Sequence, residues 1–238
     1  MSRLTFQGTN NLVPFWTPNG KRIVFTSNKE GQRNLFWQFS DGSGGLERLA
    51  TSESLQIPAS WSPDGRLLAF AEQNAQTGYD IWVLRLGDHK AQPFLKTSFN
   101  ENAPQFSPDG QWLAYGSDES GRYEIYVQPY PGPGGKWQIS TEGGREPLWN
   151  RNGRELFYRT GTKVMAVDIA TRPNFSAGAP KMLFQGPYDT LATSTPNYDV
   201  SPDGQRFLML KPIEQPVQID VVLNWFEELK QKVPLAKK

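Results

Sequence analysis

The sequence lacks several residue types on which common enzyme chemistry depends. Its 238 residues include no cysteine and a single histidine, His89. The absence of cysteine excludes disulfides, thiolate metal sites and a cysteine nucleophile. A serine nucleophile would need a histidine base held by a third group, and a zinc centre would depend mostly on carboxylates. We therefore expect neither nucleophilic catalysis nor a bound metal, and we expect no cofactor.

Long apolar runs and a charge imbalance are also missing. No apolar run approaches the ~20 residues that a membrane-spanning helix requires, and MSRLTFQGTNNLVPF at the N-terminus has no apolar core of the signal-peptide type. The formal net charge is +1 and charged residues are spread along the chain. Nucleic-acid binding would need a basic stripe on one surface. We therefore expect no nucleic-acid partner and no insertion of this chain into a membrane.

Glycine, proline and aromatic residues are abundant, which is typical of many short strands joined by tight turns. One pattern repeats along the chain, as FWTPNGKRIVF (15–25), SWSPDGRLLAF (60–70), QFSPDGQWLAY (105–115), LWNRNGRELFY (148–158) and DVSPDGQRFLM (199–209). The turn glycines are 45, 45, 43 and 51 residues apart. Five copies at a nearly constant period indicate a repeat architecture.

Each copy has the residues of a tight turn between antiparallel strands. Proline at the second position, Asp or Asn at the third and glycine at the fourth favour a type I turn with a left-handed glycine. Ser62 and Asp64 also suit hydrolytic catalysis, but a catalytic site occurs once and this pattern occurs five times. We assign the turn role to Pro18, Asn19, Gly20, Pro63, Asp64, Gly65, Pro108, Asp109, Gly110, Asn152, Gly153, Pro202, Asp203 and Gly204.

The residues after each turn predict a strand that is buried on both faces. Leu68, Ala69 and Phe70 are consecutive and apolar, and the other copies follow the same pattern. Because adjacent side chains of a strand point to opposite faces, both faces must be covered. With its other predicted strands, each repeat has the content of one β-propeller blade. We predict an all-β fold, a β-propeller of four-stranded antiparallel blades over 1–223, with repeats near 13–51, 58–97, 103–141, 147–186 and 196–223.

The two ends of the chain complete this prediction. The fifth repeat lacks a fourth strand, and 2–7 matches the outer strands in character, so we expect 2–7 to close a five-bladed ring. The alternative is part of a six-bladed ring. Asn224 suits a helix N-cap with Glu227 three residues later, which predicts a C-terminal helix over 224–234. Residues 235–238 are then a tail.

The recurring P-x-[WF]-S-P-D-G-x-x-[LI]-A-[FY], followed by [DE]-I-[WY]-V, resembles the WD40-like repeats of TolB-type β-propellers. Segments such as GYDIWVL and YVQPYPGPGGKWQIST are similar to the C-terminal propeller of large bacterial serine/threonine protein kinases. That resemblance implies a sensory or interaction module of a signalling kinase. It implies a periplasmic or extracytoplasmic location if the chain is a fragment of a membrane-anchored kinase. If Met1 is the natural start, we expect a cytoplasmic protein.

These observations predict a non-enzymatic module that binds a protein, peptide or small ligand at one mouth of the propeller. The candidate ligand-binding residues come from the loops between the second and third strands: Asn28, Arg33, Tyr79, Arg122 and Tyr123. Two alternatives remain open. One is the gating propeller of a prolyl-oligopeptidase-type hydrolase, and the other is a channel-site enzyme that uses a carboxylate-bound metal.

Overall fold

The computed structural model describes residues 4–5, 8–189 and 195–212, and these form strands, turns and loops. The first sheet comprises β1 (Asn11–Trp16), β2 (Arg22–Ser27), β3 (Asn34–Phe39) and β4 (Glu47–Arg48). The second comprises β5 (Gln56–Trp61), β6 (Leu67–Asn74), β7 (Gly78–Arg85) and β8 (Lys90–Leu95). The third comprises β9 (Glu101–Phe106), β10 (Trp112–Ser117), β11 (Glu124–Pro129) and β12 (Trp137–Gln138). Each sheet is antiparallel and keeps chain order.

The fourth sheet differs at its outer edge. It comprises β13 (Arg145–Trp149), β14 (Glu155–Thr160) and β15 (Lys163–Ala170), and β15 pairs with both β16 (Ser176–Ala177) and β17 (Lys181–Gln185). A fifth sheet contains β18 (Tyr198–Val200) and β19 (Phe207–Met209). We number these sheets blades 1 to 5. No helix in the described ranges is long and apolar enough to cross a membrane.

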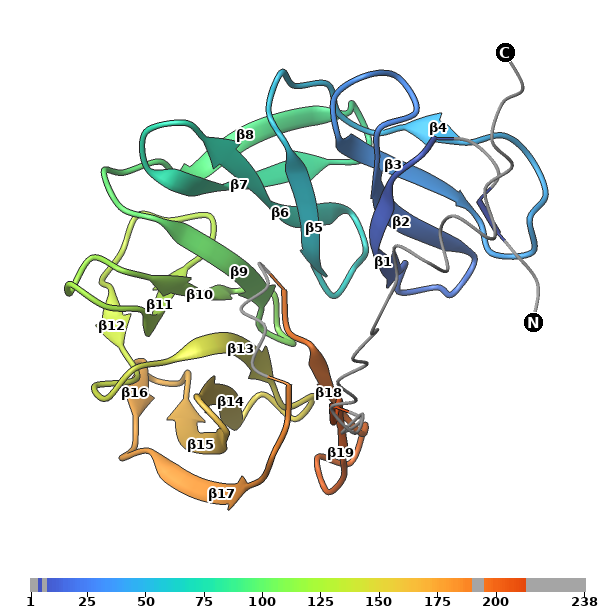
Figure 1. The fold of residues 1–238 in the computed structure, drawn as a ribbon. Coiled ribbons are helices and arrows are strands. Elements are labelled where there is room, and N and C mark those ends of the chain that lie inside the picture. The colour runs from blue at the N-terminus through green and yellow to red at the C-terminus, as the bar shows by residue number, and fades with distance from the viewer. Residues whose placement is uncertain (1–3, 6–7, 190–194, 213–238) are drawn as a thin grey trace, which may run out of the picture.

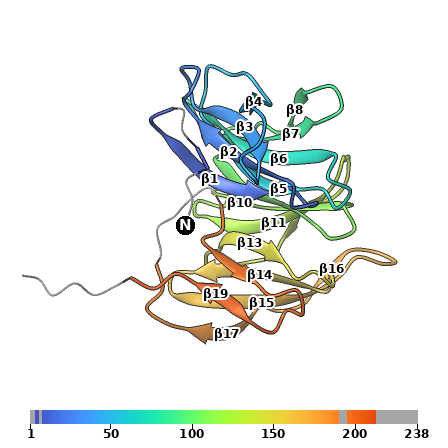
Figure 2. The same ribbon diagram turned by 90° about the vertical axis from the view of Figure 1, so that its right-hand side faces the viewer.

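The blades follow one another around a common centre (Figure 1). The first strand of each blade lies nearest this centre and the last strands lie at the periphery. Figure 2, viewed from the side, shows blade 1 at the top and blade 4 at the bottom, with blades 2 and 3 between them. This arrangement confirms the predicted all-β propeller fold. The rest of blade 5, the helix over 224–234 and the tail fall outside the described residues, as does most of 2–7, so they stay predictions.

Burial on both faces explains the consecutive apolar residues of the second strands. Leu68, Ala69 and Phe70 of β6 are fully buried. Phe70 packs in a cluster with Val24 of blade 1, whereas Ala69 packs in a cluster with Tyr115 of blade 3. The two faces of one strand therefore belong to two different interfaces between blades.

The repeated turns use their polar side chains internally. The five turn glycines have φ between 66° and 72°, a region that favours glycine. In blade 2 the Gly65 amide donates to the Ser62 carbonyl (2.9 Å). Asp64 Oδ1 accepts from Ser62 Oγ (2.6 Å) and from the Arg66 amide (3.0 Å). These bonds, with that from the Ser62 side chain foremost, lower the pKa of Asp64, so both side chains stabilise the turn.

Candidate functional site

The five predicted ligand-binding residues lie at the end of the blades opposite the repeated turns. Two of them, Asn28 and Tyr79, are hydrogen-bonded to neighbouring segments, and Arg33 is exposed. Asn28 Oδ1 accepts from the amides of Thr9 (3.0 Å) and Asn10 (2.9 Å), so it anchors the segment that leads into β1. The side chain of Arg33 is exposed. Within the described part of the chain, Arg33 makes one hydrogen bond, in which its carbonyl accepts from the Gln56 amide (2.9 Å). Tyr79 is predicted in a loop, but it lies within β7, where it pairs with Gln73 of β6 because the two strands extend further than the sequence suggests. Its amide donates to Asn100 Oδ1 (3.1 Å).

The structure brings the other two, Arg122 and Tyr123, together at one cavity. It lies between blades 3 and 4 and has a volume of about 370 Å³. Its walls come from the β10–β11 loop, the start of β13 and the β14–β15 loop. The lining residues are Arg122, Tyr123, Gly143, Gly144, Arg145, Glu146, Arg159, Thr160 and Gly161. We call this cavity the loop-end cavity.

One wall of the loop-end cavity is a cation stacked on an aromatic ring. The guanidinium carbon of Arg145 lies 3.5 Å from the centroid of the Tyr123 ring, which is a cation–π contact. The Tyr123 hydroxyl accepts a hydrogen bond from Asn102 Nδ2 (3.4 Å). Burial raises the pKa of Tyr123, so its hydroxyl stays protonated at neutral pH. This wall presents positive charge, which Arg145 carries over the face of the half-buried Tyr123 ring.

The base of the cavity holds a buried ion pair. Arg159 Nη1 lies 3.7 Å from Glu146 Oε2, and both side chains are 4% exposed. Arg159 Nη1 also donates to Asn197 Oδ1 (2.6 Å), and the Tyr198 hydroxyl donates to the Glu146 carbonyl (2.9 Å). Burial raises the pKa of Glu146 and the Arg159 charge partly opposes this. These bonds fix the pair between blades 4 and 5.

The backbone of Glu146 belongs to a feature that recurs in the first strands. Its φ is 57°, and Val13 (52°) and Ala103 (51°) adopt the same region in β1 and β9. Each of the three precedes a proline. The pairing register shifts at this point of β13 and β14, as in a β-bulge. The unusual conformation is therefore structural, and what distinguishes blade 4 is the arginine that pairs with Glu146.

Arg122 lies in a loop, but its side chain forms an ion pair with a buried residue of the same blade. Its Nε lies 2.7 Å from Glu124 Oε1, and the arginine side chain is 61% exposed whereas that of Glu124 is 1% exposed. Glu124 also accepts hydrogen bonds from Ser140 Oγ and from the Gly143 amide (3.0 Å). Arg122 therefore neutralises a buried carboxylate, and this role constrains how it can meet a ligand.

Reasoning from the sequence missed Arg145, Glu146 and Arg159, although the repeat alignment contains a signal for Arg159. Six residues after the turn glycine, the first three copies have small residues: Thr26, Ala71 and Gly116. Blade 4 has Arg159 at this position. A charged side chain at a position where the other repeats have small, buried residues shows that blade 4 differs from them there. A position that differs in one repeat is a candidate for a function specific to that repeat.

The loop-end cavity suits recognition better than bond chemistry. Arg122 and Arg159 are each held by a carboxylate, so Arg145 and Tyr123 are the groups that it presents to a ligand. Its lining contains no nucleophile paired with a base. Across the described residues, no group of three or more His, Asp or Glu side chains is arranged to hold a metal ion. A guanidinium group such as that of Arg145 matches carboxylate and peptide carbonyl oxygens.

Comparisons with known proteins agree with the fold. The sequence model of the TolB beta propeller domain matches residues 56–207. No curated protein matches the chain.

Three solved structures are similar to this chain. A protein described as a TolB from Agrobacterium tumefaciens has a TM-score of 0.65 at 18% identity over 87% of this chain and 78% of its own. TolB from Acinetobacter baumannii has a TM-score of 0.67 at 23% identity over 83% of this chain and 48% of its own. Kuenenia stuttgartiensis hydrazine synthase has a TM-score of 0.57 at 12% identity over 83% of this chain and 70% of its own. At these identities the likeness concerns the fold alone.

Proposed function

Because the chain belongs to the TolB β-propeller family, we propose that it is a non-catalytic binding module that receives a protein or peptide segment at the loop-end cavity. The observation that carries this proposal is the stacked Arg145–Tyr123 pair above the buried Glu146–Arg159 pair. A rigid base beneath a cation and an aromatic ring is a preorganised surface, and preorganisation reduces the entropy lost on binding.

The chemistry of the walls indicates what the segment presents. Arginine and tyrosine are enriched among the residues that contribute most to protein interfaces. Arg145 would meet a carboxylate or a peptide carbonyl, and the accessible part of the Tyr123 ring would contact an apolar side chain. We also propose, more specifically, that the chain is the C-terminal sensor of a bacterial signalling kinase. The resemblance of GYDIWVL and YVQPYPGPGGKWQIST to that region of such kinases supports this.

Selection of random displayed peptides on the full chain, followed by calorimetry, tests the proposal. We expect selected peptides to lose affinity by about tenfold or more, about 1.4 kcal/mol, in Arg145→Gln, with the thermal midpoint nearly unchanged. Arg33→Gln is the control, since Arg33 is an exposed arginine of the β2–β3 loop at the same end of the blades and does not line the cavity. Failure to select any peptide, or equal losses in both variants, would overturn the proposal.

A further inference from the structure

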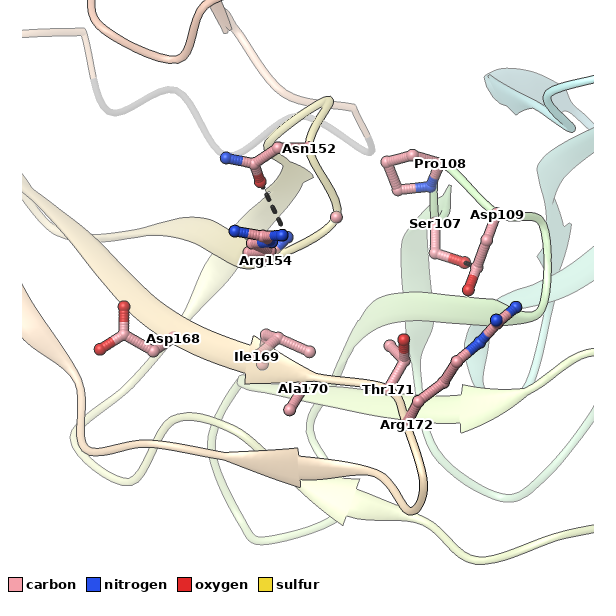
Figure 3. Close-up of a pocket in the computed structure, with 11 residues that line it drawn as sticks. Ser107, Pro108, Asp109, Asn152, Arg154, Asp168, Ile169, Ala170, Thr171 and Arg172 are labelled. Carbon is pink, nitrogen blue, oxygen red and sulfur yellow. Dashed lines mark hydrogen bonds between the residues drawn. The ribbon is translucent and has the colours of Figure 1, made fainter.

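The opposite end of the same interface is also hollowed. A cleft of about 780 Å³ lies between the turns of blades 3 and 4 and the end of β15. Figure 3 shows it with Ser107, Pro108, Asp109, Asn152, Arg154, Asp168, Ile169, Ala170, Thr171 and Arg172. We call it the turn-end cleft. Its volume falls within the range of roughly 300–1,000 Å³ that is usual for small-molecule sites.

The packing of neighbouring turns explains why the cleft opens here. In successive blades, the proline of one turn faces the glycine of the next. A Cβ placed on Gly110 would lie 3.1 Å from Pro63, and one on Gly65 would lie 3.5 Å from Pro18. At the interface of blades 3 and 4, a Cβ placed on Gly153 would lie 4.0 Å from Pro108. Of these three contacts between turns, the one beside the cleft is the loosest.

The two carboxylates that line the cleft, those of Asp109 and Asp168, already have bonding partners. Asp109 accepts hydrogen bonds from Ser107 Oγ (2.5 Å) and the Gln111 amide (3.1 Å). Asp168 is paired with Lys181, at 2.6 Å. Both carboxylates are therefore already engaged.

Two arginines of the cleft carry positive charge that is not paired with any described residue. Arg154 and Arg172 are exposed, and their guanidinium groups make no hydrogen bond or ion pair with any described residue. Figure 3 shows Arg154 on the turn of blade 4 and Arg172 reaching from the end of β15 toward the turn of blade 3. Between them lies an apolar surface that includes Pro108, Ile169 and Ala170. A ligand that complements this surface has an anionic head and an apolar body.

We propose that the turn-end cleft binds a small organic anion, whose carboxylate or phosphate group is held by Arg154 or Arg172 at one side of the cleft and whose apolar part lies over Ile169. The planar guanidinium group binds both kinds of oxyanion through paired hydrogen bonds. This site is separate from the loop-end cavity and does not depend on the function proposed for it.

Calorimetry with three probes of similar size tests the proposal: phenylacetate, phenyl phosphate and benzyl alcohol. We expect at least one of the two anions to bind and the neutral alcohol to bind much more weakly. A preference for one anion identifies the head group. If neither anion binds at millimolar concentration, or if the alcohol binds as well as both anions, the proposal is wrong.

Variants of the three nearby arginines give the second part of the test. One of the two variants, Arg154→Gln or Arg172→Gln, should weaken binding of the anion by about tenfold and so identify the arginine that holds the head group; if neither weakens it, the proposal is wrong. Arg151→Gln is the matched control, because Arg151 is an exposed arginine of the same turn that does not line the cleft. It should leave affinity unchanged. An equal loss in Arg151→Gln would show that only the general surface charge attracts the anion, which would overturn the site.

Discussion

Glu101→Gln should stabilise the protein above neutral pH and remove part of its pH dependence. Glu101 is the first residue of β9 and is 2% exposed. One carboxylate oxygen accepts a hydrogen bond from the Thr97 hydroxyl, and the other is buried without a partner among the described residues. Burial, and then the charges of Asp80, Glu119 and Asp118, raise its pKa from 4.5 to about 7.

The magnitude follows from the difference between the folded and unfolded pKa values. Between pH 4.5 and about 7, the folded state holds a proton on Glu101 that the unfolded state has lost. The free energy of unfolding therefore falls as pH rises through this window and levels off above it. A difference of about 2.5 in pKa, at about 1.4 kcal/mol for each unit, gives an upper limit of about 3 kcal/mol.

Urea unfolding of the wild type and Glu101→Gln at a series of pH values measures this contribution. The two proteins should be similar in stability near pH 4.5, and the variant should become more stable by about 1–3 kcal/mol above pH 7. Glu53→Gln, which removes an exposed carboxylate, should reproduce none of this gain. Equal stability profiles for the wild type and Glu101→Gln would refute the reasoning, since the buried carboxylate would then titrate at its ordinary pKa.

Three further perturbations test other features, each by urea unfolding. Arg122→Ala should lose about 1–3 kcal/mol, because it leaves buried Glu124 without its cation; an unchanged midpoint would argue against that role. Trp61→Ala should lose about 3–5 kcal/mol, since Trp61 is 9% exposed in the cluster between blades 1 and 2; a loss below 1 kcal/mol would contradict core packing. Gly110→Ala should lose more than Gly153→Ala, because both have positive φ but the Cβ at Gly110 is closer to a proline; the opposite order would contradict the contact between turns.

The fold could be predicted because the features that define it recur. The turn glycine and the apolar residues after it appear five times, so the pattern identifies blade-forming strands without knowledge of any contact. WNRNG in blade 4 retains only the glycine and one asparagine of the turn, yet its glycine has φ 70° like the others. A tight reversal between two strands depends on that conformation more than on the proline or aspartate.

The candidate site could be predicted only in part, because it depends on contacts that do not recur. Loop position pointed to Arg122 and Tyr123, and both line the loop-end cavity. Position alone did not show that Arg122 neutralises Glu124 or that Asn28 anchors the chain before β1. The pairing of Glu146 with Arg159 joins two strands of blade 4, and it follows from geometry that neither residue type reveals by itself.

The hollowed interface between blades 3 and 4 has a consequence for how the propeller holds together. In an array of stacked units, cooperativity passes between neighbours only through their shared interface. The interface of blades 3 and 4 has an apolar cluster at its centre, which joins Ala114 and Val127 of blade 3 to Trp149 and Leu156 of blade 4, so a loss of packing in one of these blades is passed to the other. Both hollows are lined by residues of blades 3 and 4, so a molecule bound in either one would add contacts between two blades that are already joined at their core.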